Sequence, residues 1–217
     1  MKTELCNIMK NHGSDKGDDW HNYTQIYSSL FSSLREEVKL VFELGIGSVN
    51  PAISSHMKNN YSPGGSLRGW REFFPNVQIY AADIDKDILQ PEERITKFYV
   101  DQTNPAVVSE MWNQVGVDNF DIIIDDGLHT YKANKVFFEN SFKQLSAEGI
   151  FIIEDIPNKE LNYFRTELAK IATDLDFSTR LLQLKHNSNK TDNNIMIITA
   201  NQNYISIVDT MPSELFL

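Results

Sequence analysis

The stretch FDIIIDDGLHTY, residues 120–131, fixes the centre of the expected sheet, because three isoleucines run directly into two aspartates, a glycine and a histidine. A nearly continuous apolar run is typical of a strand buried on both faces of a parallel sheet. In open parallel sheets, ligands bind beyond the carboxyl ends of the strands. We therefore expect a central strand that carries Asp125, Asp126 and His129 to the rim of a ligand site.

Other short apolar runs recur along the chain with helical patterns between them. Four resemble the first: VKLVFELG, VQIYAADID, ITKFYVDQ and GIFIIEDI, at 38–45, 77–85, 95–102 and 149–156. Helical patterns occupy 21–34, 105–115, 131–145 and 158–173. STRLLQL and NIMIITA, at 178–184 and 194–200, are joined by a polar loop too short for a helix, which favours an antiparallel hairpin at the sheet edge. The sequence predicts an α/β, Rossmann-like fold with a mostly parallel seven-stranded sheet and helices on both faces.

The composition is that of an ordinary globular protein, with 217 residues, 41% of them hydrophobic and 23% charged. We expect one domain over 1–217, with residues 1–37 as an N-terminal helical cap. The formal net charge of -10 opposes binding of a phosphate backbone, so nucleic acid is excluded as a partner. The single cysteine, Cys6, and the lack of an apolar run of signal-peptide or membrane-span length predict a cytoplasmic protein without a membrane span. The sequence does not determine the oligomeric state, and a homo-oligomer is possible.

The residues that follow the first three strands suggest an adenosine-type ligand. Gly45 and Gly47 follow the first strand, where missing side chains allow a close approach of backbone to ligand. Asp83 follows the second, in the place of a carboxylate that binds ribose hydroxyls. The third glycine of a dinucleotide fingerprint is replaced by Asn50, and no phosphate loop occurs. An adenosine ligand without a phosphate chain remains, for which S-adenosylmethionine is the leading candidate.

The fourth and fifth strands end in DDGLH and IEDI, which bring several carboxylates and one histidine to the same edge. Methyl transfer to an alcohol needs a base or a cation that lowers the pKa of the hydroxyl. Converging carboxylates repel one another by ~1 kcal/mol per pair at 4 Å in water, so a cation should compensate. Apart from Lys132, which follows three residues after the histidine, no lysine or arginine lies close to either cluster in sequence, which favours a hard divalent cation such as Mg²⁺.

Taken together, VFELGIGS and IYAADID resemble the motifs of class I S-adenosylmethionine-dependent methyltransferases. HGSDKG, HNYTQIY, GGSLRGWREFFP, DDGLHT and FIIEDI, in that order, narrow the resemblance to metal-dependent sugar O-methyltransferases of the mycinamicin and macrolide-tailoring type, and to related proteins of bacterial polysaccharide gene clusters. The similarity covers roughly residues 11–157.

The resemblance implies a role for individual residues of the catalytic end. It makes Asp126, Glu154 and Asp155 the metal ligands and His129 the general base, a role that suits an imidazole titrating near neutral pH. Asp126 is therefore expected to be both a metal ligand and a catalytic residue. Asp125 has two interpretations, as the N-cap of the following helix or as a residue that faces the cofactor.

The resemblance also places the cofactor. Glu43, Gly45 and Gly47 would line its methionine and ribose side, Asp83 would bind the ribose hydroxyls, and Asp101 with Gln102 would face the adenine. Ser14, Asp15 and Lys16 would close over its amino-acid end, with a solvated surface turn as the alternative for Asp15 and Lys16. Ser66 is expected in a loop that covers the cofactor, with a merely exposed loop as its alternative.

The expected function is therefore S-adenosylmethionine-dependent, Mg²⁺-dependent O-methylation of a sugar hydroxyl in a polysaccharide, a nucleotide-linked sugar or a glycosylated metabolite. The elements that would select the acceptor are the N-terminal helix, the link over 49–65 and the loop over 185–193. Three alternatives remain: another acceptor such as a catechol, a phosphorylated intermediate or an amine; a non-catalytic cofactor-binding protein; and a dehydrogenase, which the missing third glycine disfavours.

Overall fold

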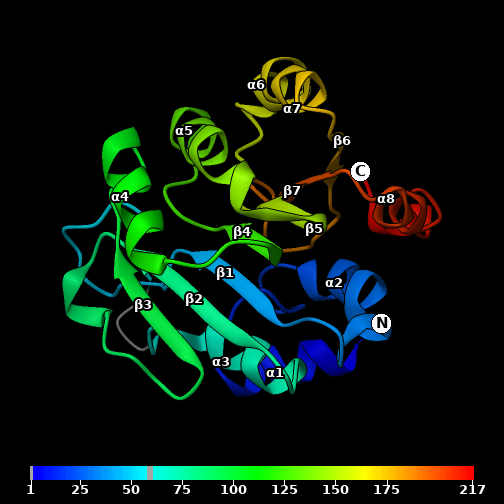
Figure 1. The fold of residues 1–217 in the computed structure, drawn as a ribbon. Helices are drawn as coiled ribbons and strands as arrows, with labels where there is room; N and C mark the ends of the chain where they lie inside the picture. Colours follow the sequence, from blue (N-terminus) through cyan, green and yellow to red (C-terminus); the bar gives the residue numbers. More distant parts are fainter. Residues whose placement is uncertain (1, 58–60) are drawn as a thin grey trace.

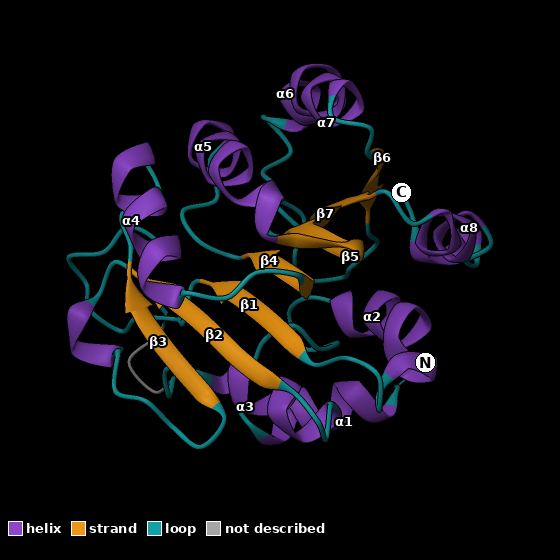
Figure 2. Cartoon of the chain, viewed as in Figure 1, coloured by secondary structure: helices purple, strands orange, loops and turns teal. Residues whose placement is uncertain are grey.

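A computed structural model describes residues 2–57 and 61–217 of the chain, which form a sheet with helices on both faces (Figures 1 and 2). Seven strands lie in the order β3-β2-β1-β4-β5-β7-β6. Their bounds are β1 Leu40–Leu44, β2 Gln78–Asp83, β3 Ile95–Tyr99, β4 Phe120–Asp125, β5 Leu145–Ile153, β6 Ser178–Gln183 and β7 Asn194–Thr199. Strands β1 to β5 pair in parallel, whereas β7 pairs antiparallel with both β5 and β6. The predicted parallel sheet with an antiparallel C-terminal hairpin is confirmed.

The helices form two layers, which Figure 1 shows on opposite sides of the sheet. One layer holds α1 Glu4–Asn11, α2 Tyr23–Phe31, α3 Gly65–Phe73 and α8 Gln202–Asp209. The other holds α4 Pro105–Val115, α5 Tyr131–Ser141 and a helical stretch made of α6 Leu161–Tyr163, the π-helical η4 Phe164–Leu168 and α7 Ala169–Asp174. Short 3-10 turns occur at η1 Ser32–Leu34, η2 Lys86–Ile88, η3 Phe142–Gln144 and η5 Ser213–Leu215.

The central isoleucines show why the sheet needs both layers. Ile122 and Ile124 face the core with α1, α2, α3 and α8, whereas Ile123 faces the core with α4 and α5, and all three are at most 1% exposed. Full burial of such a side chain contributes about 1.5–3 kcal/mol, so a continuous apolar strand is stable only between two covering layers.

Four helices follow the predicted segments, and three were not predicted. The helix at 105–115 has the predicted bounds, because the Asn104 side chain caps its start and Gly116 ends it at φ +68°. The helix expected over 131–145 ends at Ser141, and Leu145 already begins β5. Helices α1, α3 and α8 are new. The loop expected at Ser66 is wrong: Ser66 lies in the first turn of α3, which buries Leu67, Trp70 and Phe73.

No helix in the described part of the chain is long and apolar enough to cross a membrane. Helices α1 and α2 pack into the same core as the sheet. A single domain with an N-terminal cap stays a prediction.

The ends of β1, β4 and β5 are tied to one another in register. Leu44 pairs with Asp125, and Asp125 pairs with Ile153. One residue further, the N–H of Asp126 donates to the carbonyl of Leu44, and the N–H of Glu154 donates to the carbonyl of Asp125, both at 2.9 Å. Gly45, at φ +92°, lies so close that a Cβ there would be 2.0 Å from the carbonyl oxygen of Asp126.

We expect Gly45→Ala to lower the free energy of unfolding by at least about 2 kcal/mol, because left-handed strain and a backbone clash add together. Gly116→Ala is the matched control: its φ is also positive, but the nearest atom would be 3.9 Å from a new Cβ, so a loss of about 1 kcal/mol is expected. Urea unfolding of both variants checks this. Equal losses would mean that the close approach at Gly45 costs nothing.

Candidate active site

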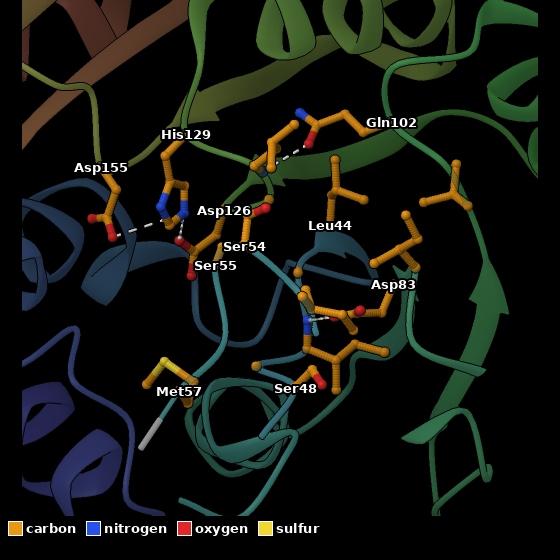
Figure 3. Close-up of a pocket in the computed structure, with 18 of the residues that line it drawn as sticks. Leu44, Ser48, Ser54, Ser55, Met57, Asp83, Gln102, Asp126, His129 and Asp155 are labelled. Carbon is orange, nitrogen blue, oxygen red and sulfur yellow. Dashed lines mark hydrogen bonds and ion pairs between the residues drawn. The ribbon is translucent and has the colours of Figure 1, made fainter. Parts of the chain in front are cut away.

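A cavity of about 380 Å³ lies at the carboxyl ends of the parallel strands (Figure 3). Its walls come from the turns after β1 to β5, from the segment around Lys16 and from the link after β1. The predicted site residues that line it are Ser14, Asp15, Lys16, Gly45, Gly47, Ser66, Asp83, Asp101, Gln102, Asp126, His129 and Asp155. Glu43, Asp125 and Glu154 are almost fully buried and lie outside its lining.

At one end of the cavity, Asp83 holds the turn after β1. One oxygen of its carboxylate accepts the N–H of Ile46 at 2.7 Å, and the other accepts the N–H of Asp85 at 2.9 Å. Burial raises the pKa of Asp83. Ser48, which lies in the turn after β1, donates to the carboxylate of Asp85, which follows β2. Each oxygen of Asp83 keeps a further lone pair that a ribose hydroxyl could use.

On the predicted adenine side, the amide of Gln102 makes hydrogen bonds to other residues of the protein. The Gln102 amide is used inside the protein: Nε2 donates to both oxygens of Asp125 at 2.8 and 2.9 Å, and Oε1 accepts the N–H of Leu128 at 2.9 Å. Asp125 also accepts from Asn134 at 2.9 Å. It therefore faces the framework behind the cavity, where burial raises its pKa to about 6. Asp101 lines the cavity and accepts from Thr103.

At the other end, Asp126, His129 and Asp155 converge, as Figure 3 shows. His129 Nε2 lies 3.2 Å from Asp126 Oδ1 and 3.9 Å from Asp155 Oδ2. One ligand atom from each of the three residues lies within 4.8 Å of the others. His129 and Asp155 both adopt left-handed backbone conformations, at φ 57° and 52°. Two carboxylate oxygens and an imidazole at this spacing fit a hard divalent cation.

The charges of this cluster determine the state of its groups. Burial works against ionisation of His129, but its hydrogen bond to Asp126 and the charge of Asp155 raise its pKa to about 10. Burial would likewise raise the pKa of Asp126, but Lys16 and His129 hold it below the ordinary value. The two carboxylates therefore favour the protonated form of the imidazole.

Lys16 supplies a cation that local sequence does not reveal. Its ammonium lies 2.6 Å from Asp126 Oδ2 and 3.7 Å from Glu43 Oε1, and it contacts Glu154 directly. Burial disfavours the charge, yet Asp126 and Glu154 raise the pKa of Lys16 well above its usual value. The surface turn considered for Lys16 is wrong, since the residue is only 2% exposed. Lys16 is thus a compensating cation that sequence reasoning, which favoured a divalent metal ion, did not assign to these carboxylates.

The two buried glutamates belong to the framework around Lys16. Glu43 accepts from Ser66 and from the indole N–H of Trp70, the latter at 2.6 Å. Glu154 accepts from Tyr27 and Lys16, so both its oxygens are occupied. Glu154, predicted as a metal ligand, is not one of the three residues whose ligand atoms converge, although it shares Lys16 with Asp126. Glu43 does not line the cavity.

Sequence reasoning named the link over 49–65 as an element that would select the acceptor, but it singled out none of the residues between 49 and 65 as site residues. In the structure, the link lines the cavity with Ile53, Ser54, Ser55, Met57 and Tyr61; residues 58–60 of this link lie outside the described residues. No pattern in the link marks these five residues. The loop over 185–193 packs on the N-terminal segment, where Asn22 donates to the carbonyl of Lys185 and Asn193 donates to Asn22.

Comparison with known proteins identifies related enzymes, although no family model matches the chain. Two relatives come from Streptomyces olivaceus. The 8-demethyl-8-alpha-L-rhamnosyl tetracenomycin-C 2'-O-methyltransferase is 30% identical over 154 residues, which is 70% of this chain and 37% of that protein. The 8-demethyl-8-(2-methoxy-alpha-L-rhamnosyl)-tetracenomycin-C 3'-O-methyltransferase is 31% identical over 153 residues, again 70% and 37%. The match thus spans little more than a third of these relatives.

Among solved structures, the fold matches the MycE methyltransferase from the mycinamycin biosynthetic pathway in complex with Mg and SAH. The TM-score is 0.67 at 25% identity, and the match covers 92% of this chain and 55% of that one. The Rossmann-like methyltransferase fold is therefore confirmed.

We expect Gln102→Leu to lower the free energy of unfolding by about 1–3 kcal/mol, because it removes donors from a buried carboxylate and leaves the N–H of Leu128 without its acceptor. Gln114→Leu is the matched control, since Gln114 is an exposed helix residue bonded to Glu110, and its effect should stay within about 0.5 kcal/mol. Urea denaturation measures both. If Gln102→Leu proved as mild as Gln114→Leu, the framework role of Gln102 would be refuted.

Proposed function

Because the chain is related in sequence to sugar O-methyltransferases and has a methyltransferase fold, we propose that it transfers the methyl group of S-adenosylmethionine to a sugar hydroxyl. The observation that carries the proposal is the continuity of the cavity. Asp83 and the glycine turn lie at one end, and Asp126, His129 and Asp155 lie at the other. An in-line transfer needs donor and acceptor in one such space.

We propose Asp126 and Asp155 as the carboxylates that would hold Mg²⁺, with His129 beside them. The MycE structure was solved with Mg and SAH, and the oxygen donors of this chain suit the same metal. When bound, the ion would supply Lewis acidity that lowers the pKa of the acceptor hydroxyl. Glu154 is the less favoured ligand, because the converging ligand atoms belong to Asp126, His129 and Asp155 and do not include its oxygens.

His129 would take the proton of the acceptor hydroxyl. It can do so only as a neutral imidazole, and Asp126 and Asp155 now stabilise its protonated form. Pairing these carboxylates with a divalent cation would remove much of that stabilisation and return the pKa of His129 toward the neutral range. Metal binding and base function are thus coupled through the same two side chains.

The acceptor we propose is a sugar with two adjacent hydroxyls. The two tetracenomycin relatives are named for transfer to the 2' and 3' oxygens of one rhamnosyl group. These relatives therefore act on neighbouring positions of a rhamnosyl group, and the second acts when position 2 already carries a methoxy group. The pairing of two hydroxyls on one cation rests on the metal site proposed for Asp126 and Asp155. A glycosylated small molecule is the acceptor class that these relatives favour, and a polysaccharide or a nucleotide-linked sugar is the alternative.

We expect His129→Ala to lower kcat by about 10²- to 10⁴-fold while the Kd for S-adenosylhomocysteine, measured by calorimetry, stays within about twofold. His12→Ala is the matched control, because that histidine pairs with Glu72 on the surface, 2.7 Å away, and its loss should leave turnover unchanged. Unaltered turnover in His129→Ala would contradict the role of base. Binding of NAD in place of S-adenosylhomocysteine would contradict the methyltransferase itself.

The metal and the diol are tested with methyl α-L-rhamnoside in a panel of neutral glycosides. Excess EDTA should abolish methyl transfer, and added Mg²⁺ should restore it. An acceptor that lacks one hydroxyl of the reactive pair should lose more kcat/KM than one that lacks a distant hydroxyl. Full activity in EDTA would exclude the metal mechanism, and equal losses for the two analogues would exclude the paired hydroxyls.

A further inference from the structure

The N-terminal segment from Lys16 to Tyr27 binds the outer oxygens of the carboxylates at the ends of β4 and β5. We propose that Tyr23 is a positioning residue of the metal site, whose hydroxyl fixes Asp155 so that one carboxylate oxygen stays turned toward Asp126 and His129. This inference rests on the metal-dependent function proposed above, and it assigns a role in it to a residue outside the cavity lining.

The contacts of Asp155 carry the proposal. The hydroxyl of Tyr23 lies 2.8 Å from Asp155 Oδ1 and also accepts the backbone N–H of Asp155 at 3.3 Å. One phenol thus holds both the main chain and the side chain of the same residue. His21 Nδ1 approaches the same Oδ1 at 3.5 Å. The other oxygen, Oδ2, faces His129 Nε2.

Asp126 repeats this division between an outer and an inner oxygen. Its Oδ2 is bound by Lys16 at 2.6 Å, and its Oδ1 faces His129 Nε2 at 3.2 Å. The two inner oxygens therefore converge on one point because donors from the N-terminal segment hold the two outer ones. Outer hydrogen bonds of this kind orient metal ligands and raise metal affinity.

A tyrosine suits this position because its hydroxyl can donate to a carboxylate oxygen and accept a backbone N–H at the same time. Its ring is held by stacking on His21, with ring centroids 4.6 Å apart, and the residue is fully buried. Asp155 also has a left-handed backbone, so its side-chain direction depends on such outside contacts.

The test is Tyr23→Phe, which keeps the ring and removes only the hydroxyl. After removal of metal by chelator, Mn²⁺ is titrated into the full chain with S-adenosylhomocysteine present, and free Mn²⁺ is followed by electron paramagnetic resonance. We expect Mn²⁺ affinity to fall about 10- to 100-fold, with unchanged affinity for S-adenosylhomocysteine. Tyr204→Phe is the matched control, because Tyr204 is buried in the same core on α8, outside the cavity lining.

Tyr27→Phe provides a second arm that does not depend on the folding of the first variant. Tyr27 donates to Glu154, which keeps Lys16 as a partner, so a smaller loss of Mn²⁺ affinity is expected. Parent-like Mn²⁺ affinity in Tyr23→Phe, or losses no larger than in Tyr204→Phe, would overturn the positioning role alone. A parent chain that binds S-adenosylhomocysteine but no Mn²⁺ would overturn the metal-dependent function, and the positioning role with it.

Discussion

The site rests on the shared register of three strand ends. Leu44, Asp125 and Ile153 lie in one row across β1, β4 and β5, so the next residue of each strand, Gly45, Asp126 and Glu154, falls in a second row. Backbone hydrogen bonds between Asp126 and Leu44, and between Glu154 and Asp125, hold that second row in place. Side chains alternate along a strand, so a slip of one residue would turn Asp126 into the framework and bring Asp125 to the cavity. The fold therefore determines which of two adjacent aspartates can do chemistry.

Concentrating carboxylates at one edge has an electrostatic cost that the N-terminal segment offsets. Like charges 4 Å apart repel by about 4 kcal/mol at the effective dielectric constant of a protein surface. The buried ammonium of Lys16 forms ion pairs with three of these carboxylates, those of Glu43, Asp126 and Glu154. An ion pair so buried is stable only with further hydrogen bonds, and Ser66, Trp70 and Tyr27 provide them. Helix α2 and the turn before it are thus part of the catalytic end, although they are far from it in sequence.

Features that depend on local pattern could be predicted from the sequence. The apolar runs predicted all seven strands, and the predicted bounds of α4 agree with the structure, where the Asn104 side chain caps its start and Gly116 ends it. Helix α3 was missed because Gly64 and Gly65 at its start are typical of a loop, while its stability comes from burying Trp70 and Phe73. The clustering of Asp126, His129 and Asp155 was predictable from strand ends. The contacts of Lys16 with Asp126 and Glu154 were not, because they join residues more than a hundred positions apart and no local periodicity encodes such a contact.

Two residues at the catalytic end, His129 and Asp155, have backbone conformations that the surrounding structure must hold in place. Among the described residues, five other than glycine have positive φ, and His129 and Asp155 are two of them. A left-handed residue costs roughly 1–2 kcal/mol, and histidine gains less from local hydrogen bonds than asparagine does. Such strain persists only where the surroundings over-determine the conformation. Here Tyr23 holds the main chain of Asp155, and the tie of Asp126 to Leu44 fixes the start of the turn that carries His129. The strain turns the imidazole and the second carboxylate toward Asp126, which a relaxed continuation of either strand would not do.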